Sequence, residues 1–84
     1  MYRGYKIKKD EYTLEVENIE NVGLDIYSVK YVVKKGHEEL VSGVVFVTRE
    51  NYSRVLKDTL NEIVRGVKRV ENLIRRNFSN LGGV

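Results

Sequence analysis

Five cations are concentrated in the segment RGVKRVENLIRR, residues 65–76, with Glu71 as the only acid among them. Guanidinium and ammonium groups at this density can bind phosphates, so the segment could contact a nucleic-acid backbone. It could instead form the solvated outer face of a helix, or flank a helix that docks on a partner. Spacings of three, four and seven place the cations along one side of a helix. These cations are Arg65, Lys68, Arg69, Arg75 and Arg76.

Catalytic and metal-binding patterns do not emerge from the sequence. His37 is the only histidine, it lies in a predicted turn, and no serine or cysteine partner is within sequence reach. The carboxylates have no spacing typical of a metal site, and Gly36 is not preceded by a strand and followed by a helix as in a phosphate-binding loop. We therefore predict a protein that is not an enzyme and that uses no cofactor and no metal.

Composition indicates one small soluble domain over residues 1–84. Charged residues make up 32% of the chain and hydrophobic residues 42%, which is typical of a globular protein. The absence of cysteine fits the reducing cytoplasm, and no apolar run is long enough for a membrane span or a signal peptide. The net charge of +3 arises entirely after residue 49, where there are seven cations and four acids, whereas residues 1–49 carry eight of each. A chain of this length often gains stability by self-association.

Four strands are predicted from alternating apolar and polar residues and from the turns between them. In the third strand this alternation places Tyr27, Val29, Tyr31 and Val33 on one face. The turn after it contains Gly36, which can adopt positive φ. The fourth strand is apolar on both faces, so we predict that it is central or covered. The predicted strands span about residues 2–9, 12–19, 25–35 and 39–47.

A long helix is predicted over residues 49–77, because the apolar period changes after Thr48, which can cap the helix. Such a helix would be about 43 Å long, against an expected radius of gyration of about 12 Å. It must therefore extend beyond its sheet or break, and Gly66 is the obvious place for a break. Residues 79–84 are predicted to be a frayed tail. The order β-β-β-β-α predicts an α+β domain whose helix lies across one face of an antiparallel sheet.

The helix carries an apolar seam with heptad-like steps, whose first half can cover the sheet. Its distal half, with Leu73 and Phe78 beside it, would remain exposed in a monomer, and exposed apolar patches mark interfaces. We therefore predict a homodimer through the helices. The seam begins at Leu56, and its predicted interface residues are Leu60, Ile63, Val67, Val70 and Ile74.

Cations are also predicted on the outer face of the sheet, where Lys6, Lys8, Lys30 and Lys34 could form a basic groove. Glu15 would share that face and partly cancel its field, as would Glu17, and the lysines could simply keep the sheet surface soluble. The chain has six tyrosines. Tyr2 and Tyr5 are the candidates for base stacking, whereas core or interface positions are predicted for Tyr12, Tyr27, Tyr31 and Tyr52.

Three segments together resemble the single-strand-binding domain of the transcriptional positive-cofactor coactivators. VTRENYSRV, residues 47–55, resembles the family's junction of last strand and helix, and YKIKKDEYTLEV and SVKYV resemble its first two segments. The resemblance covers most of residues 5–64. Two features depart from the family pattern: Ser42 and Gly43 stand where the family has a basic pair, and Val33 stands where it has a base-stacking Trp.

This resemblance implies a homodimer that binds single-stranded DNA or RNA across its curved sheets, in transcription or replication. By position, Lys30 matches a DNA-contacting Arg of the family, with Tyr31 nearby. The alternative hypothesis is a regulatory or adaptor protein whose helix seam docks a protein partner, with the cations serving only as surface. The predicted nucleic-acid contacts, from the residues and the resemblance together, are Lys6, Lys8, Lys30, Tyr31, Lys34, Arg65, Arg69, Arg75 and Arg76.

Overall fold

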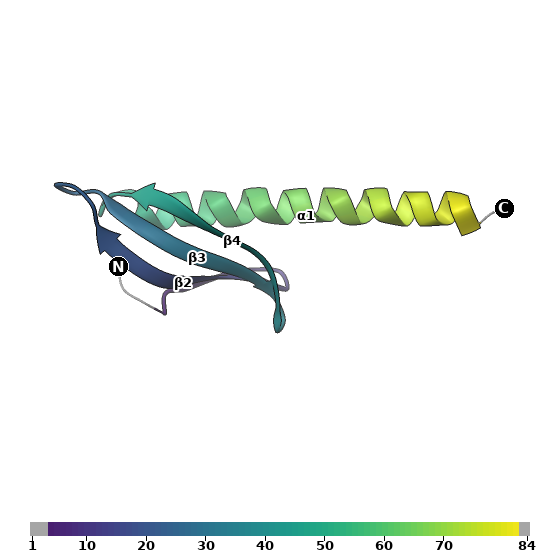
Figure 1. The fold of residues 1–84 in the computed structure, drawn as a ribbon, viewed down its shortest axis with the longest axis horizontal. Coiled ribbons are helices and arrows are strands. Elements are labelled where there is room, and N and C mark those ends of the chain that lie inside the picture. Colours follow the sequence, from purple (N-terminus) through teal and green to yellow (C-terminus); the bar gives the residue numbers. More distant parts are fainter. Residues whose placement is uncertain (1–3, 83–84) are drawn as a thin grey trace.

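The protein is an α+β domain in which four antiparallel strands are followed by one C-terminal helix (Figure 1). A computed structural model describes residues 4–82, with side chains through residue 76. The strand order in the sheet is β1-β2-β3-β4, so each strand pairs with its neighbour in sequence. This confirms the fold class predicted from the sequence. The elements are β1 (Lys6–Lys9), β2 (Tyr12–Asn21), β3 (Tyr27–Lys35), β4 (Glu38–Val47) and α1 (Tyr52–Gly82).

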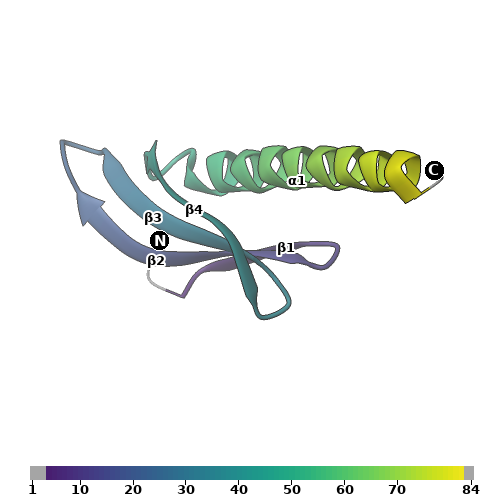
Figure 2. The ribbon, with the colours of Figure 1, turned by 45° about the vertical axis from the view of Figure 1, so that its right-hand side comes forward.

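Two tight turns, one joining β1 to β2 and one joining β3 to β4, lie at the end of the sheet beyond which the helix extends (Figure 2). Asp10 has φ of 55° in the β1–β2 turn, a conformation that a short polar side chain tolerates better than most. Gly36 has φ of 63° in the β3–β4 turn, as its lack of Cβ allows. The sequence prediction of positive φ at Gly36 is therefore confirmed.

The register of β3 against its neighbours separates the two faces of the sheet. Val29 pairs with Ile19, Tyr31 with Val16 and Val33 with Leu14. A register shift between Val16 and Asn18 keeps apolar residues on one face through both halves of the long β2 strand. The predicted shared face of β3 is confirmed, and it is the face that the helix covers.

The core lies between this face and the first half of the helix. The helix buries Leu56, Leu60 and Val64, each at most 2% exposed, at a spacing of four residues. Val64 was not in the predicted seam, because the heptad steps passed through Ile63 instead. The buried stripe thus follows one straight side of the helix rather than a coiled-coil path. The sheet contributes Tyr12, Leu14, Val16, Val29, Val33 and Val47.

Thr48 and Asn51 fix the start of the helix, as predicted for Thr48. The Asn51 backbone N–H donates to the Thr48 hydroxyl at 3.3 Å, and the Thr48 N–H donates to the Asn51 side-chain oxygen at 2.7 Å. This reciprocal pair satisfies two backbone donors that a helix N-terminus would otherwise leave free. The chain therefore turns from β4 directly into a helix that runs back over the sheet.

Helix α1 is continuous for 31 residues and does not break at Gly66. It extends past the sheet, so the molecule measures 59 × 20 × 18 Å with a radius of gyration of 15.9 Å (Figure 1). The helix also reaches Gly82, so the predicted end at residue 77 and the predicted frayed tail from residue 79 are wrong for residues 79–82. Residues 83–84 lie outside the described residues. Gly66 is tolerated because its helical hydrogen bonds remain, at a cost of about 1 kcal/mol relative to alanine.

Two predictions about the strands require correction. Strand β1 begins at Lys6 rather than at residue 2, and residues 1–3 lie outside the described range. Strand β4 was predicted to be central or covered, but it is the last strand in the sheet order. The apolar residues on its outer face are therefore exposed rather than covered, with Val44 at 57% and Phe46 at 64%.

Candidate nucleic-acid and partner surfaces

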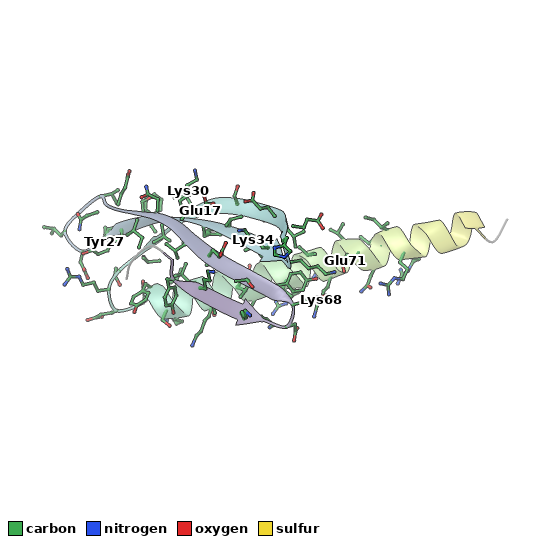
Figure 3. The ribbon with its side chains drawn as sticks, turned by 90° about the horizontal axis from the view of Figure 1, so that it is seen from below. Glu17, Tyr27, Lys30, Lys34, Lys68 and Glu71 are labelled. Carbon is green, nitrogen blue, oxygen red and sulfur yellow. The ribbon has the colours of Figure 1, made fainter. Side chains whose placement is uncertain are left out.

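Ion pairs neutralise much of the predicted basic groove on the outer face of the sheet. Glu15 lies between two of its four lysines, with one carboxylate oxygen 3.1 Å from Lys6 Nζ and the other 2.8 Å from Lys34 Nζ. Lys30 lies along β3 on the same face and is exposed (Figure 3). Lys8 is exposed at the far side of the sheet in β1. Among the described residues, this face therefore presents two separated free lysines rather than a continuous positive strip.

The same cluster shifts the pKa values of its members. The pKa of Glu15 is held below its ordinary value mainly by the hydrogen bond from Lys34 and, to a smaller extent, by the hydrogen bond from Lys6. Glu15 in turn raises the pKa of Lys34, with smaller contributions from the charges of Glu39 and Glu17. Both partners therefore stay charged across the neutral range, and the ion pairs persist there.

We expect Glu15→Gln to destabilise the fold at neutral pH by a small amount that disappears in acid. A carboxylate with a lowered pKa stabilises the folded state above its ordinary pKa and loses this contribution as pH falls through the lowered value. Urea unfolding of both proteins at pH 7 and at about pH 3 would measure the difference. Equal differences at both pH values would show that the ion pairs contribute nothing. Glu20→Gln, on the same strand, is the matched control because Glu20 is exposed and takes no part in the ion pairs that Glu15 makes.

The predicted tyrosine contacts are not grouped with the lysines. Tyr31 pairs with Gly43 on the helix-covered face, opposite to Lys30 and Lys34, and a Cβ built on Gly43 would lie 2.7 Å from the Tyr31 hydroxyl. Tyr5 packs edge to face on Tyr52, with ring centroids 5.8 Å apart. Both rings are therefore engaged within the chain, and Tyr2 lies outside the described residues. The alternation of residues along β3 already places Lys30 and Tyr31 on opposite faces of the sheet.

Most cations of the helix, unlike Lys6 and Lys34 of the sheet, are not paired with a carboxylate among the described residues. Lys68 contacts Asp10 at 3.3 Å, but the other four have no carboxylate oxygen within 4.0 Å among the described residues. Several of these side chains surround a shallow hollow of about 410 Å³ on the side of the helix. The structure thus brings the helical cations together and leaves them free to meet an anion. The hollow is lined by Arg65, Lys68, Arg69, Asn72, Leu73 and Arg76.

Two ion pairs, Lys35–Glu71 and Lys68–Asp10, hold the helix where it leaves the sheet. Lys35 Nζ lies 3.4 Å from a Glu11 oxygen and 3.6 Å from a Glu71 oxygen, and 5.7 Å from the centre of the Tyr12 ring. The Lys68–Asp10 contact lies at the same place, as the labelled Lys68 and Glu71 show (Figure 3). Glu71 therefore pairs with the sheet. These contacts fix the direction in which the basic segment projects.

The predicted dimer residues divide into buried and exposed groups. Leu60 is 1% exposed and packs in the chain's own core, so it is unavailable to a partner. Ile63 and Val67 are half-buried, whereas Val70 is 54% and Ile74 is 49% exposed. Leu73, beside them, is 50% exposed, and the side chain of Phe78 lies outside the described residues.

An apolar groove of about 400 Å³ runs between the helix and the free edge of β4. The predicted dimer residues Ile63, Val67 and Val70 line it, and Gly66 widens it because a Cβ there would meet nothing within 4 Å. Val41 of β4 forms the opposite wall, and Glu71 is the one charged residue at its margin. The groove is thus formed jointly by β4 and α1, two elements between which the sequence predicted no shared surface.

Sequence reasoning missed two other exposed apolar groups. One comprises Val44 and Phe46 on the outer face of β4. The other is the β2–β3 loop, where Leu24 is fully exposed between Val22 and Ile26. The sequence offered a signal for the loop group, because apolar residues recur at every second position on both sides of Gly23 in a segment predicted to be a loop. The β4 residues could not, because a strand apolar on both faces is also typical of a sheet interior.

In residues 4–82, no three potential metal-ligating side chains are grouped so that they could hold an ion. The helix in that range contains no stretch apolar and long enough to cross a membrane. Comparison with family models, with curated proteins and with solved structures finds no match to this chain.

Proposed function

We propose that this protein is a homodimeric nucleic-acid-binding module that contacts phosphates through the basic side of α1. The observation that carries this proposal is the contrast between two sets of cations. On the sheet, Glu15 pairs with Lys6 and Lys34, whereas on the helix Arg65, Arg69 and Arg76 are free and surround one hollow.

Arginines suit this role because the guanidinium group presents several donors to phosphate oxygens and is weakly hydrated. Arg65, Arg69 and Arg76 succeed one another at four and seven residues, or about 6 and 10.5 Å along the helix axis. A single strand is flexible enough to follow such a line of charges, and its affinity for it is salt-dependent. The resemblance to the coactivator domain supports single-stranded DNA or RNA as the ligand. The location on the helix differs from the curved sheet that the resemblance implies.

Self-association is supported by the apolar surface of the helix. Val70, Leu73 and Ile74 are each about half exposed, at the point where the helix leaves the sheet. A second copy would cover these residues and double the number of cations presented to one strand. Two linked sets of contacts bind a polymer more tightly than one, provided that the polymer can reach both.

The test is fluorescence anisotropy of labelled oligo-dT titrated with the purified protein across a salt series. We expect binding whose affinity falls steeply with salt, since each phosphate neutralised contributes a slope of about 0.7 on a single strand. A duplex of the same length, titrated in parallel, shows whether single strands are preferred. Absence of oligo-dT binding at low salt, by a protein that is folded, would reject the proposed function.

A second function, that of a protein-binding adaptor, is favoured by one specific observation. The groove between Val41 and the helix residues Ile63 and Val70 is apolar, with Glu71 as its one charged lining residue. Such a surface recognises apolar side chains rather than phosphates. If the folded protein binds neither oligo-dT nor duplex DNA, the adaptor function is the one that remains supported.

A further inference from the structure

The free edge of β4 is the feature that carries a further inference. β4 spans ten residues, Glu38–Val47, and pairs with β3 on one side only. From Leu40 to Thr48 it contains no charged residue, and the chain has no proline. A long, uncharged edge strand offers a row of unpaired backbone groups to another strand, and proteins normally protect such edges.

The opposite edge of the same sheet is protected in the usual manner. β1 is only four residues long, and three of them are Lys6, Lys8 and Lys9. Lysines and short length both disfavour the addition of another strand. The two edges of one sheet thus differ, and β4 is the edge suited to pairing.

Both faces of β4 expose apolar side chains beside this edge. On the outer face Val44 and Phe46 are 57% and 64% exposed, and on the helix-covered face Val41 is 37% exposed. The groove beside Val41 reaches the helix at Ile63 and Val70. A strand added to β4 would therefore bury apolar surface on both faces as well as satisfying the backbone groups.

We propose that a second copy of this chain pairs with β4 in antiparallel orientation, so that one continuous sheet runs through the dimer. Charge complementarity identifies the occupant and its direction. Glu38 and Glu39 lie at one end of β4, and Arg49 follows its other end, with a side chain that is 78% exposed despite its 4.0 Å contact with Asp25. Antiparallel pairing brings the glutamates of each copy to the arginine of the other, whereas parallel pairing would place glutamates together. The contact is symmetric, as in most homodimers.

This arrangement also specifies how the helices meet. A two-fold axis through the β4 edges, near Gly43 or Val44, leaves both helices on the same face of the joined sheet and makes them antiparallel. Their groove sides, with Ile63, Gly66 and Val70, then face each other across the axis. The inference rests on the self-association within the proposed function, but it does not depend on nucleic-acid binding.

Cysteine cross-linking in the full chain tests the arrangement, because the chain has no cysteine of its own. In a sheet centred on Val44, the two copies of Val44→Cys face each other about 5 Å apart at Cβ. In a sheet centred on Gly43, a mixture of Ser42→Cys and Val44→Cys forms the corresponding pair. Lys30→Cys is the matched control, since Lys30 pairs with Val44 on the same face but lies one strand further from the edge. Its two copies would be about 14 Å apart, beyond disulfide reach.

We expect light scattering to show a dimer, and mild oxidation to link Val44→Cys, or the Ser42→Cys and Val44→Cys mixture, while Lys30→Cys stays unlinked. A dimer in which neither β4 combination links faster than Lys30→Cys would overturn the proposal, and contact would then lie elsewhere. A monomer at the cross-linking concentration would overturn it as well. Oligo-dT anisotropy on unmodified protein is scored separately, so loss of the nucleic-acid function and loss of the β4 dimer are distinguishable.

Discussion

Arg69→Glu combined with Arg76→Glu is expected to weaken oligo-dT binding by at least about tenfold at low salt. Both guanidinium groups line the hollow on the outer side of the helix, and neither has a carboxylate partner among the described residues. Reversal removes two phosphate contacts and adds two repulsive charges at the same place. The salt dependence of the remaining binding should also become shallower, because fewer counterions are released.

The matched control is Lys30→Glu combined with Lys34→Glu. This variant makes the same change in net charge, but on the sheet, where Lys34 already pairs with Glu15 at 2.8 Å. We expect it to reduce affinity much less than the helix variant does. An equal or larger loss on the sheet would contradict the assignment to the helix and favour the surface that the coactivator resemblance implies. Circular dichroism of both variants establishes that each is folded.

Leu60→Ala is expected to destabilise the fold by about 2–5 kcal/mol. Leu60 is 1% exposed, at the centre of the stripe of fully buried helix residues, Leu56, Leu60 and Val64, that packs on the sheet. The substitution removes buried methyl groups and leaves a cavity, because the strands beneath it cannot fully close. In a domain of this size a loss of 1 kcal/mol lowers Tm by about 4–8 °C, so the change is readily measured by thermal unfolding.

The control for this prediction is Leu24→Ala, which makes the same chemical change at a residue that is fully exposed in the β2–β3 loop. Its effect on the free energy of unfolding should be within about 0.5 kcal/mol. Similar losses at the two positions would mean that the helix does not pack on the sheet through Leu60, and the described core would be wrong.

The periodic elements of this fold could be predicted from sequence because each follows from local chemistry. The alternation of Tyr27, Val29, Tyr31 and Val33 identifies the core face of β3, and Gly36 marks the hairpin turn. The position of β4 could not be predicted in this way. A strand with Val44 and Phe46 on one face and Val41 on the other has the same pattern at an edge as in the interior, so pairing partners decide its environment.

The candidate site was only partly predictable for a similar reason. Sequence placed Lys6, Lys30 and Lys34 on one face, and the structure agrees, but the state of charge on that face depends on which cations Glu15 reaches. Such contacts join three strands and leave no local signature. The arrangement of the helical cations was easier to predict, because the spacing of Arg65, Arg69 and Arg76 in the sequence alone places them along one side of a helix.

The length of α1 beyond its last buried contact has a thermodynamic consequence. Among the described side chains of the helix, through residue 76, none beyond Val64 is fully buried, yet the helix continues to Gly82. Most of the stability of helices in proteins comes from tertiary packing, of which this segment has little, and Gly66 at its base lowers its helix propensity. The helix–coil equilibrium of the distal segment is therefore linked to whatever contacts it. A ligand that touches Arg69 and Arg76, or a second copy that covers Val70, shifts this equilibrium toward helix, and each then binds more readily in the presence of the other.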